Sequence, residues 1–502
     1  MLKQGKATGY GVADFKYICC LIHTMKKYIL SLLVTVITAG VFAQGYQVTL
    51  QVPQYKTGIA YLTYYMGPNL NVADSAAVSN SGTAIFKGAK KLPGGIYVAV
   101  FPDRRQRTEF LIDKEQKITV RVGDTNNLAA TTVVTGSPAN NLYVQYQKFV
   151  AQKAVLLEAE RKAYNQSRTK PDSLFHERNY NKYNQELNNY RDNLVKTQPT
   201  AMMAVLLKAM KEPVVPVTHP VTKQDSVQNY YYYKSHYWDG ITFMDERVIR
   251  TPFFLPRLER YYREVMPQAP DSLIRDIDYK LLLARNSTEM YKYLLNWLTD
   301  EYINPKYMGL DAVFVHLFEK YHSKGLTSWL NDKQMESISR RAYMLMANLV
   351  GEKAANLEML DTDEKPTALY DVVADYTVVC FWDPNCGHCK EEVPRLDSIY
   401  EASWKMHGVK VFAVLTPDEK ENAKPEWKKF IAEHHLTGWT HAYKTKEMEE
   451  ADFKAQKAGF RQLYDITLTP TLYLLDKNKN IVGKKLTIQQ LNELLEVKWK
   501  NN

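Results

Sequence analysis

At 502 residues, the chain is too long for one hydrophobic core, and a usual domain size of roughly 100 to 200 residues predicts about three domains. Its composition, 45% hydrophobic and 24% charged residues, is globular and excludes a disordered or collagen-like chain. Of the net charge of +10, five lysines against one aspartate place +4 in residues 1–43, and the remaining +6 is spread without Lys/Arg-rich blocks. We therefore expect no nucleic acid and no anionic membrane surface as partner.

A segment near the start of the chain has the pattern of an export signal. From Met25 the sequence runs through two lysines, an apolar stretch and small residues before Gln44. This order of basic, apolar and small residues predicts a signal peptide over residues 25–43, cleaved before Gln44. Residues 1–24 are then an N-terminal extension ahead of the true initiator, Met25.

An uncleaved membrane anchor is the alternative interpretation of this segment. Its apolar run is shorter than the roughly 20 residues that a spanning helix needs, and no later segment is long and apolar enough to cross a bilayer. No cysteine follows the cleavage site, which argues against a lipoprotein anchor. We expect export across the inner membrane to the periplasm or cell envelope, without stable membrane insertion after signal cleavage.

Residues 44–137 have the pattern of short strands. Polar and apolar residues alternate in YQVTLQV, GIAYLTYY, GIYVAVF, TEFLI and KITVRV, and turn signals such as Gly94-Gly95 separate these runs. Alternation with period two is typical of strands with one buried face. This region is predicted to be an antiparallel β-sandwich.

Residues 138–350 are predicted to form an all-α middle domain. Ser137 followed by Pro138 is a typical helix start, since serine is a good cap residue and proline fits the first turn. Apolar residues recur every three or four positions in segments 287–303 and 311–322, as in amphipathic helices.

The stretch 229–243, NYYYYKSHYWDGITF, is rich in tyrosine. Its rings can stack on a ligand, or they can pack helices together with their hydroxyl groups at the rim. We favour the packing interpretation.

Residues 351–502 alternate between strands and helices. TVVCFW, VKVFAVL and TLYLLD are apolar runs typical of buried strands, and helical segments lie between them. TLYLLD with the following KNKNIVG predicts an antiparallel hairpin, and residues 487–500 predict a final helix. The order is that of an α/β domain with a mixed sheet, joined to the middle domain through the acidic, polar segment 351–366.

Two of the five cysteines, Cys386 and Cys389, lie in the segment FWDPNCGHCKEEVP after the first of these strands. A strand-to-helix turn places Cys386 at a helix N-terminus, where free amides and the helix dipole stabilise a thiolate. A protonated His388 adds positive charge, and Cys389 follows one turn later. The spacing predicts a redox pair in which Cys386 attacks a partner disulfide and Cys389 resolves the mixed disulfide.

The segment FWDPNCGHCKEEVP and the later LTPTLYLLD resemble the thioredoxin superfamily, and more closely its secreted TlpA/ResA-like branch. The resemblance covers about residues 351–500. It depends on several separated features, namely Phe381 and Trp382, the CxxC pair, Pro394 at the helix-kink position, and Thr469-Pro470. It implies a thioredoxin-like fold, preceded by a β-sandwich and a helical domain of the kinds, of unknown function, found in such secreted bacterial proteins.

The resemblance also implies roles for single residues. Pro470 matches the family's cis-proline, whose loop lies against the pair, and the backbone of Thr469 is expected to bind an extended segment of the partner. Glu392 matches a glutamate that manages the protons of the pair, the alternative being a solvated helix carboxylate. Trp382 and His388 complete the expected substrate-binding set.

Two features depart from the family pattern. Many thioredoxins have a buried aspartate where this chain has Cys380, so deprotonation of Cys389 is expected to use Glu392 or water. Cys380 itself is expected to be an inert buried thiol. The Gly-His dipeptide inside the pair resembles that of protein disulfide isomerase, which predicts a potential nearer about −180 mV than thioredoxin's roughly −270 mV.

A metal site and a structural disulfide are the alternative explanations of the pair. A zinc site typically needs four ligands, and beside the single CxxC the nearest histidines in sequence are His434, His435 and His441. A disulfide that closes so short a loop removes little entropy from the unfolded chain. We expect no metal and no other cofactor.

The sequence therefore predicts an enzyme, a thiol-disulfide oxidoreductase that reduces or shuffles disulfides of envelope proteins. Its expected partners are protein thiols and disulfides in the cell envelope, together with an electron donor that the sequence does not identify. The alternative is an envelope binding or scaffold protein whose thioredoxin-like domain mainly docks partners.

Overall fold

The computed structural model describes residues 45–417 and 423–500. The predicted signal peptide, 25–43, and the extension before it lie outside these residues. The described chain divides into two compact units. The first consists of residues 45–213, 239–241 and 246–256, and the second of residues 214–238, 242–245 and 257–500.

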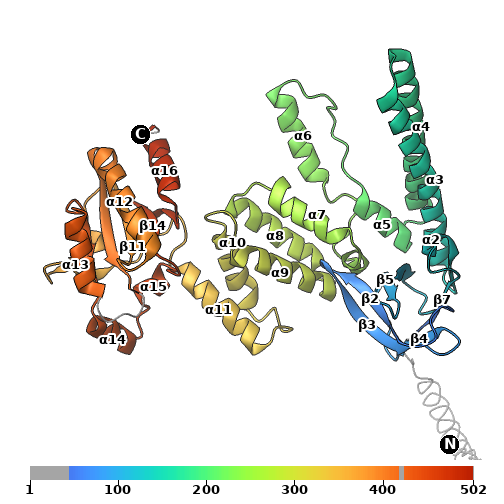
Figure 1. The fold of residues 1–502 in the computed structure, drawn as a ribbon, viewed down its shortest axis with the longest axis horizontal. Coiled ribbons are helices and arrows are strands. Elements are labelled where there is room, and N and C mark those ends of the chain that lie inside the picture. Colours follow the sequence, from blue (N-terminus) through green and yellow to red (C-terminus); the bar gives the residue numbers. More distant parts are fainter. Residues whose placement is uncertain (1–44, 418–422, 501–502) are drawn as a thin grey trace, which may run out of the picture. The chain divides into compact units, whose positions relative to one another are not determined.

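The first unit begins with two four-stranded sheets, ordered β4-β1-β7-β8 and β3-β2-β5-β6 (Figure 1). The strands are β1 (Tyr46–Gln51), β2 (Ile59–Met66), β3 (Asn69–Ala77), β4 (Thr83–Gly88), β5 (Gly95–Val100), β6 (Arg107–Ile112), β7 (Lys117–Val122) and β8 (Thr132–Thr135), with a short helix α2 (Leu128–Thr131) before β8. Val48 and Leu50 of β1 are fully buried, whereas Thr49 between them is not. The two sheets share one apolar core, which confirms the predicted sandwich.

One strand pair corrects the expectation of antiparallel strands throughout. β1 and β7 run parallel, with Val48 opposite Ile118 and Leu50 opposite Val120. The alternation of polar and apolar residues specifies which face of a strand is buried, and it is the same for either direction of the neighbouring strand. The sequence pattern therefore could not distinguish this pair.

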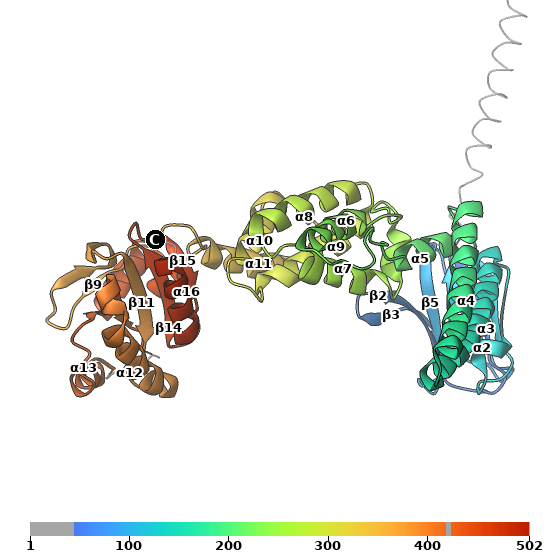
Figure 2. The same ribbon diagram turned by 90° about the horizontal axis from the view of Figure 1, so that it is seen from above.

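Helices α3 (Pro138–Gln166), α4 (Lys170–Thr197) and α5 (Met202–Met210) follow the sheets. α3 and α4 form a hairpin and lie side by side in both views (Figure 1, Figure 2). The predicted start of α3 is confirmed, because the Ser137 side chain accepts a hydrogen bond from the Asn140 amide at 3.3 Å. The buried Asn140 side chain also accepts from the Leu111 amide and donates to the Leu111 carbonyl, which attaches α3 to edge strand β6.

This attachment changes where the first unit ends. A second apolar cluster joins the sheet to α3, α4 and α5 through Ile96, Leu111, Tyr143, Tyr146, Leu194, Met202, Met203, Leu206 and Leu207. The predicted helical domain, residues 138–350, is therefore not one compact unit. Its first three helices belong with the sheets, because their apolar faces are buried there.

Residues 223–346 are mainly helical, as predicted. The elements are α6 (Lys223–His236), α7 (Phe254–Arg260), α8 (Pro270–Ala284), α9 (Thr288–Ile303), α10 (Asp311–Leu317) and α11 (Asp332–Met346), a 3-10 helix at Glu246–Arg250, and π-helical turns at Tyr261–Val265 and Phe318–His322. In the tyrosine-rich stretch, Tyr237 is fully buried and its hydroxyl donates to the Arg257 carbonyl at 2.9 Å, whereas Tyr231 is exposed. Tyr237 therefore serves packing.

The last third is a five-stranded mixed sheet, ordered β13-β12-β11-β14-β15, with helices around it and a separate antiparallel pair, β9 and β10. Its elements are β9 (Glu358–Leu360), β10 (Pro366–Ala368), β11 (Tyr376–Trp382), α12 (Gly387–Ala402), β12 (Val409–Leu415), α13 (Ala423–Glu433), β13 (Thr440–Ala442), α14 (Lys446–Lys454), α15 (Phe460–Leu463), β14 (Thr471–Asp476), β15 (Ile481–Lys484) and α16 (Ile488–Lys500), with 3-10 helices at Leu369–Asp371 and Trp404–His407. β11 is parallel to β12 and antiparallel to β14. The predicted mixed sheet and hairpin are confirmed.

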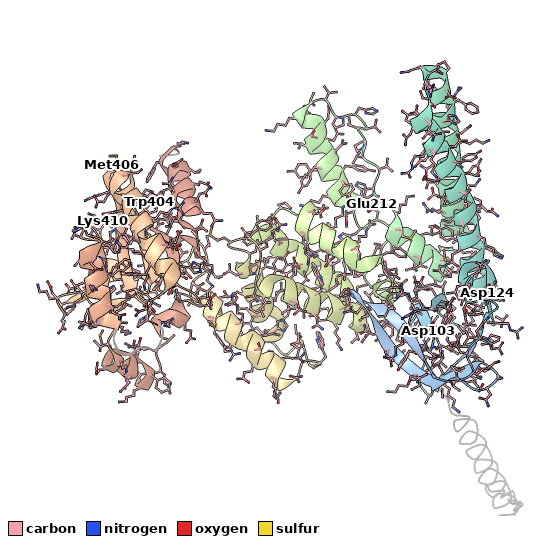
Figure 3. All side chains as sticks on the ribbon, in the orientation of Figure 1. Asp103, Asp124, Glu212, Trp404, Met406 and Lys410 are labelled. Atoms are coloured by element: carbon pink, nitrogen blue, oxygen red, sulfur yellow. The ribbon has the colours of Figure 1, made fainter. Side chains whose placement is uncertain are left out.

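The central strand β11 is buried on both faces, which explains its continuous apolar sequence. Cys380 and Trp382 point to the core formed with α12, α13 and α16, whereas Phe381 points to the opposite core with α15. On the first face, the buried Trp404 (Figure 3) donates from Nε1 to the Asn492 side chain of α16 at 2.8 Å. The shared core of Cys380 and Trp382 with Cys389, Val393 and Leu396 holds β11 and α12 together around the turn between them.

Across residues 45–417 and 423–500, no helix combines the length and the apolar character that crossing a membrane would need.

Candidate active site

Cys386 lies where β11 turns into α12. It is the N-cap residue of α12, with φ −73° and ψ 126°, and its thiol makes no capping bond to the helix. Its side chain is partly exposed, and its sulfur lies 3.3 Å from the carbonyl oxygen of Thr469, to which the thiol donates. The structure therefore places Cys386 at the helix N-terminus that the sequence predicted.

The pKa of Cys386 is set by opposing effects. Partial burial of the thiol disfavours the thiolate, but hydrogen bonds from the Thr469 side chain and from the backbone amides of Cys389 and His388 outweigh it. The pKa of Cys386 is thereby lowered from that of an ordinary thiol. A partly exposed sulfur with a lowered pKa is the form of cysteine that acts as a nucleophile.

Cys389, one turn into α12, has the opposite properties. It is fully buried, and its sulfur accepts a hydrogen bond from the Asp383 amide at 3.5 Å. Burial raises the pKa of Cys389 to about 12, and the negative charge of the Cys386 thiolate contributes to the increase. Both thiols are free in this structure, so it represents the reduced pair.

Cys380 occupies the position on β11 where many thioredoxins have a buried aspartate. It is fully buried on the same face as Cys389, and burial raises the pKa of its thiol well above the ordinary value. A protonated, enclosed thiol of this kind is a poor nucleophile.

Asp383 was not among the residues predicted for the site. It is buried at the end of β11, and its backbone amide donates to Cys389 while its carboxylate accepts from the Asn385 amide at 2.9 Å. Asp383 therefore shapes the turn that holds both cysteines. The available signal was its place in the DPN turn between the strand and the first cysteine.

The loop before β14 completes the front of the site. The Thr469-Pro470 peptide bond is cis, as expected. Thr469 and Pro470 are partly exposed, and Leu468 before them is 77% exposed. The loop is held by a hydrogen bond of 2.6 Å from the Thr471 hydroxyl to the Leu468 carbonyl.

A groove of about 640 Å³ adjoins this loop and α12. Its lining consists of Cys380, of His388, Glu392, Val393, Arg395 and Leu396 from α12, of Thr467–Leu472, and of Lys485–Gln489 after β15. Apolar side chains make most of its surface, and charged groups from α12 and Lys485 are added to them. The shape and composition suit a segment of another polypeptide chain.

Two of the predicted site residues, His388 and Glu392, lie on α12 at the groove. His388 is exposed and lines the groove, and Glu392 lines it as well. The Glu392 carboxylate forms an ion pair with Arg395 at 3.4 Å. The structure thus brings His388, Glu392, Thr469 and Pro470 together around one groove.

Trp382 requires a correction. It was expected to bind substrate, but it is fully buried in the core of the domain, where its ring packs against Phe430 with centroids 5.2 Å apart. As the last residue of β11, Trp382 points to the face covered by α12 and α13. Trp382 therefore packs in the core behind the cysteine pair and does not contact a partner.

No three His, Cys, Asp or Glu side chains come together as a metal site within the described part of the chain. Of the histidines considered as ligands, His441 is buried and its Nε2 is bonded to the Leu436 carbonyl at 2.7 Å. Burial lowers the pKa of His441 to about 4, so the ring is neutral at physiological pH.

Comparisons with known proteins divide the chain in a similar way. Residues 350–484 match the model of the AhpC/TSA family, and residues 46–143 match that of a domain of unknown function, DUF4369. No curated protein matches the chain.

Several solved structures are similar to parts of it. A domain of a possible thiol-disulfide isomerase from Cytophaga hutchinsonii is 36% identical over 30% of this chain and 95% of that chain, with a TM-score of 0.26. A thiol:disulfide interchange protein from a Bacteroides species is 28% identical over 31% and 93%, with a TM-score of 0.26. A thioredoxin-like protein from Bacteroides caccae is 21% identical over 57% and 98%, with a TM-score of 0.42.

Proposed function

We propose that the chain is a thiol-disulfide oxidoreductase that reduces or shuffles disulfides of proteins in the cell envelope, and that its redox pair lies in residues 350–484, which match the AhpC/TSA family model. The observation that carries the proposal is the contrast between two thiols one helical turn apart. Cys386 is accessible and has a lowered pKa, whereas Cys389 is buried and has a raised one. This division suits an attacking and a resolving cysteine.

In the first step, the Cys386 thiolate attacks one sulfur of a partner disulfide. A bond forms between Cys386 and that sulfur, the partner's S–S bond breaks, and the second partner sulfur leaves as a thiolate that takes up a proton. We propose that the partner backbone pairs with Thr469 while a side chain enters the groove beside Pro470. His388, exposed at the same groove, contacts the partner there.

In the second step, Cys389 attacks the Cys386 sulfur and releases the first partner sulfur as a thiol. The partner then carries two more electrons, and the Cys386–Cys389 disulfide has formed. The Cys386 thiolate contributes to the raised pKa of Cys389. Since the mixed disulfide carries no charge on Cys386, the pKa of Cys389 falls when it is needed.

Cys389 must still lose a proton from a buried position. We propose that Glu392 accepts it, directly or through water, because the Glu392 carboxylate lines the groove next to α12. Glu392→Gln should then slow release of the mixed disulfide while leaving its formation unchanged. Equal release rates at every pH for Glu392→Gln and the unsubstituted chain would exclude this role.

We propose export to the periplasm or cell envelope, where an electron donor keeps the pair reduced. The Gly-His dipeptide supports a potential near about −180 mV, at which the pair can reduce or rearrange disulfides if a donor is present. Equilibration of the purified chain with glutathione buffers measures this potential. A value below that of thioredoxin, roughly −270 mV, would remove the isomerase-like part of the proposal.

The direct test is reduction of insulin by the purified full chain with dithiothreitol as donor. Cys386→Ala should abolish the activity above the uncatalysed rate. Cys380→Ala is the matched control, since it removes a thiol from the neighbouring strand, and it should retain activity. Unchanged insulin reduction by Cys386→Ala would refute a thiol-disulfide site at this position.

A binding or scaffold role is distinguished by trapping. In Cys389→Ala the second step is blocked, so an oxidoreductase should accumulate mixed disulfides with client proteins when expressed in its own cell envelope. Cys386→Ala with Cys389→Ala is the control that cannot form them. A protein that only docks partners traps none, and mass spectrometry of the trapped species identifies the clients.

A further inference from the structure

Helices α10 and α11 bind the thioredoxin-like domain beside its active-site groove. They belong to the second compact unit together with that domain. Their polar side chains contact two segments that continue directly into the groove wall. One segment is the end of β15 with the residues after it, and the other is the turn after α15.

The first contact holds the end of β15. Lys484 is buried and its ammonium group donates to the carbonyl and side-chain oxygens of Asn348 at 2.8 and 2.7 Å. It also forms an ion pair with the buried Asp311 at the start of α10. A buried lysine with three oxygen partners fixes the backbone that carries it.

The second contact is a linked set of three charges. The Asp465 carboxylate is buried, with Arg341 of α11 at 2.8 Å on one oxygen and Lys485 at 2.6 Å on the other. Both cations lower the pKa of Asp465 despite its burial. Arg341 and Lys485 thus share one carboxylate, and the position of each depends on it.

These residues adjoin both sides of the groove. Lys485 is the first residue of the Lys485–Gln489 wall, and Asp465 lies two residues before Thr467, where the opposite wall begins. Lys485 and Asp465 both have left-handed backbones, with φ of 54° and 46°. Such backbone conformations are unfavourable for residues other than glycine and persist where surrounding contacts hold them.

The Lys485–Gln489 wall is anchored to the core through Leu486 and the buried Ile488, whereas Lys485 at its start lies between two open spaces. Lys485 and Leu486 line the active-site groove and also a second cavity of about 390 Å³, which Arg341 and Asp465 line as well. The position of Lys485 therefore depends on its ion pair with Asp465, whose carboxylate Arg341 holds from the other side.

We propose that Arg341 is a positioning residue for client binding, which through Asp465 and Lys485 sets the spacing of the two groove walls beside Cys386. This inference rests on the proposed oxidoreductase function and assigns a role to a helix outside the thioredoxin-like domain. Arg341 touches neither cysteine, so it acts on the binding of a large partner and leaves the chemistry of the pair unchanged.

The test separates client binding from thiol chemistry. Arg341→Gln leaves Asp465 with Lys485 as a partner, so the carboxylate is not orphaned and the chain should fold. The KM for insulin should rise about tenfold, because small displacements of a binding wall are costly. The kcat, the redox potential and the rate at which the reduced chain reacts with the small disulfide 5,5′-dithiobis(2-nitrobenzoate) should remain within twofold.

Two controls accompany this variant. Arg341→Lys keeps a cation facing Asp465 and should restore most of the KM. Arg340→Gln removes the neighbouring, exposed arginine of α11 and should have no effect. Lys485→Gln removes the other ion pair of Asp465. Its effect on KM should not add to that of Arg341→Gln, because both substitutions interrupt the same Arg341–Asp465–Lys485 connection.

Each outcome has a defined meaning. A KM for insulin in Arg341→Gln equal to that of the unsubstituted chain overturns the inference, and so does a parallel loss of reactivity toward the small disulfide. An unsubstituted chain that reacts with neither insulin nor the small disulfide removes the proposed function itself. The two failures are therefore distinguishable.

Discussion

The helix starts of α3 and α12 solve the same problem in opposite ways. Both N-cap residues, Ser137 and Cys386, have extended backbones, with φ and ψ of −146° and 108° in one and −73° and 126° in the other. Ser137 accepts a hydrogen bond from the amide three residues on. Cys386 makes no such bond as a thiol, and the amides of its first turn instead favour its ionised form.

The difference shows how one backbone geometry serves stability in one place and reactivity in another. Unsatisfied amides at a helix N-terminus cost free energy. A serine hydroxyl removes this cost by accepting a hydrogen bond, whereas a cysteine side chain removes it only when it is ionised to a thiolate. The amides at the start of α12 therefore favour negative charge on the Cys386 sulfur. In α3 the Asn140 amide is satisfied by Ser137, and the Asn140 side chain fastens the helix to a sheet edge.

The strongest way to break this comparison is to give α12 an ordinary cap. Cys386→Ser places an oxygen where the amides of the first turn point, so the variant should lose insulin reduction entirely. It should also be more stable than Cys386→Ala by about 1 kcal/mol, the usual value of a capping bond. Thermal unfolding under reducing conditions measures the difference, and equal stabilities of the serine and alanine variants would contradict the capping account.

The next effect concerns the pH at which the sulfurs react. A lowered pKa means that the Cys386 thiolate is present at a lower pH than that of an ordinary thiol, about 8.5, so its alkylation rate should reach half of its maximum below that pH. Cys389, with a pKa of about 12, should stay unmodified over the same range. Iodoacetamide labelling followed by peptide mass spectrometry gives both profiles, and a Cys386 midpoint no lower than that of an ordinary thiol would contradict the lowered pKa.

Much of the fold could be predicted because its signals are local. The apolar run of β11, the cap at Ser137 and the alternation in β1 each specify an element within a few residues. The direction of β7 beside β1 and the grouping of α3 with the sheets were not predictable in this way. Both depend on contacts between distant parts of the chain, such as Asn140 with Leu111.

The candidate site shows the same limit. The positions of Cys386, Cys389 and the cis-proline loop follow from motifs, and the structure brings them together. The burial of Trp382 was missed, because a tryptophan next to a cysteine pair gives no sign of which face of the strand it occupies. Arg341 could not be predicted from the sequence, because it and Lys485 are far apart in the chain and meet only at the Asp465 carboxylate of the folded protein.

The smallest expected effect tests the structural half of the comparison. Ser137→Ala removes the acceptor for two donors of the buried Asn140, its amide and its side-chain nitrogen at 3.3 and 2.9 Å. The loss of a buried cap should cost about 1 to 2 kcal/mol of unfolding free energy and leave insulin reduction unchanged.

Thr169→Ala is the matched control, because Thr169 caps α4 through a longer bond of 3.4 Å at an exposed position. Chemical denaturation should find its cost below 1 kcal/mol, since water can replace an exposed cap. Equal costs at the two positions would mean that the burial of Asn140 contributes nothing to the attachment of α3. Loss of redox activity in Ser137→Ala would instead show that this helix start is not purely structural, and the contrast with Cys386 would no longer hold.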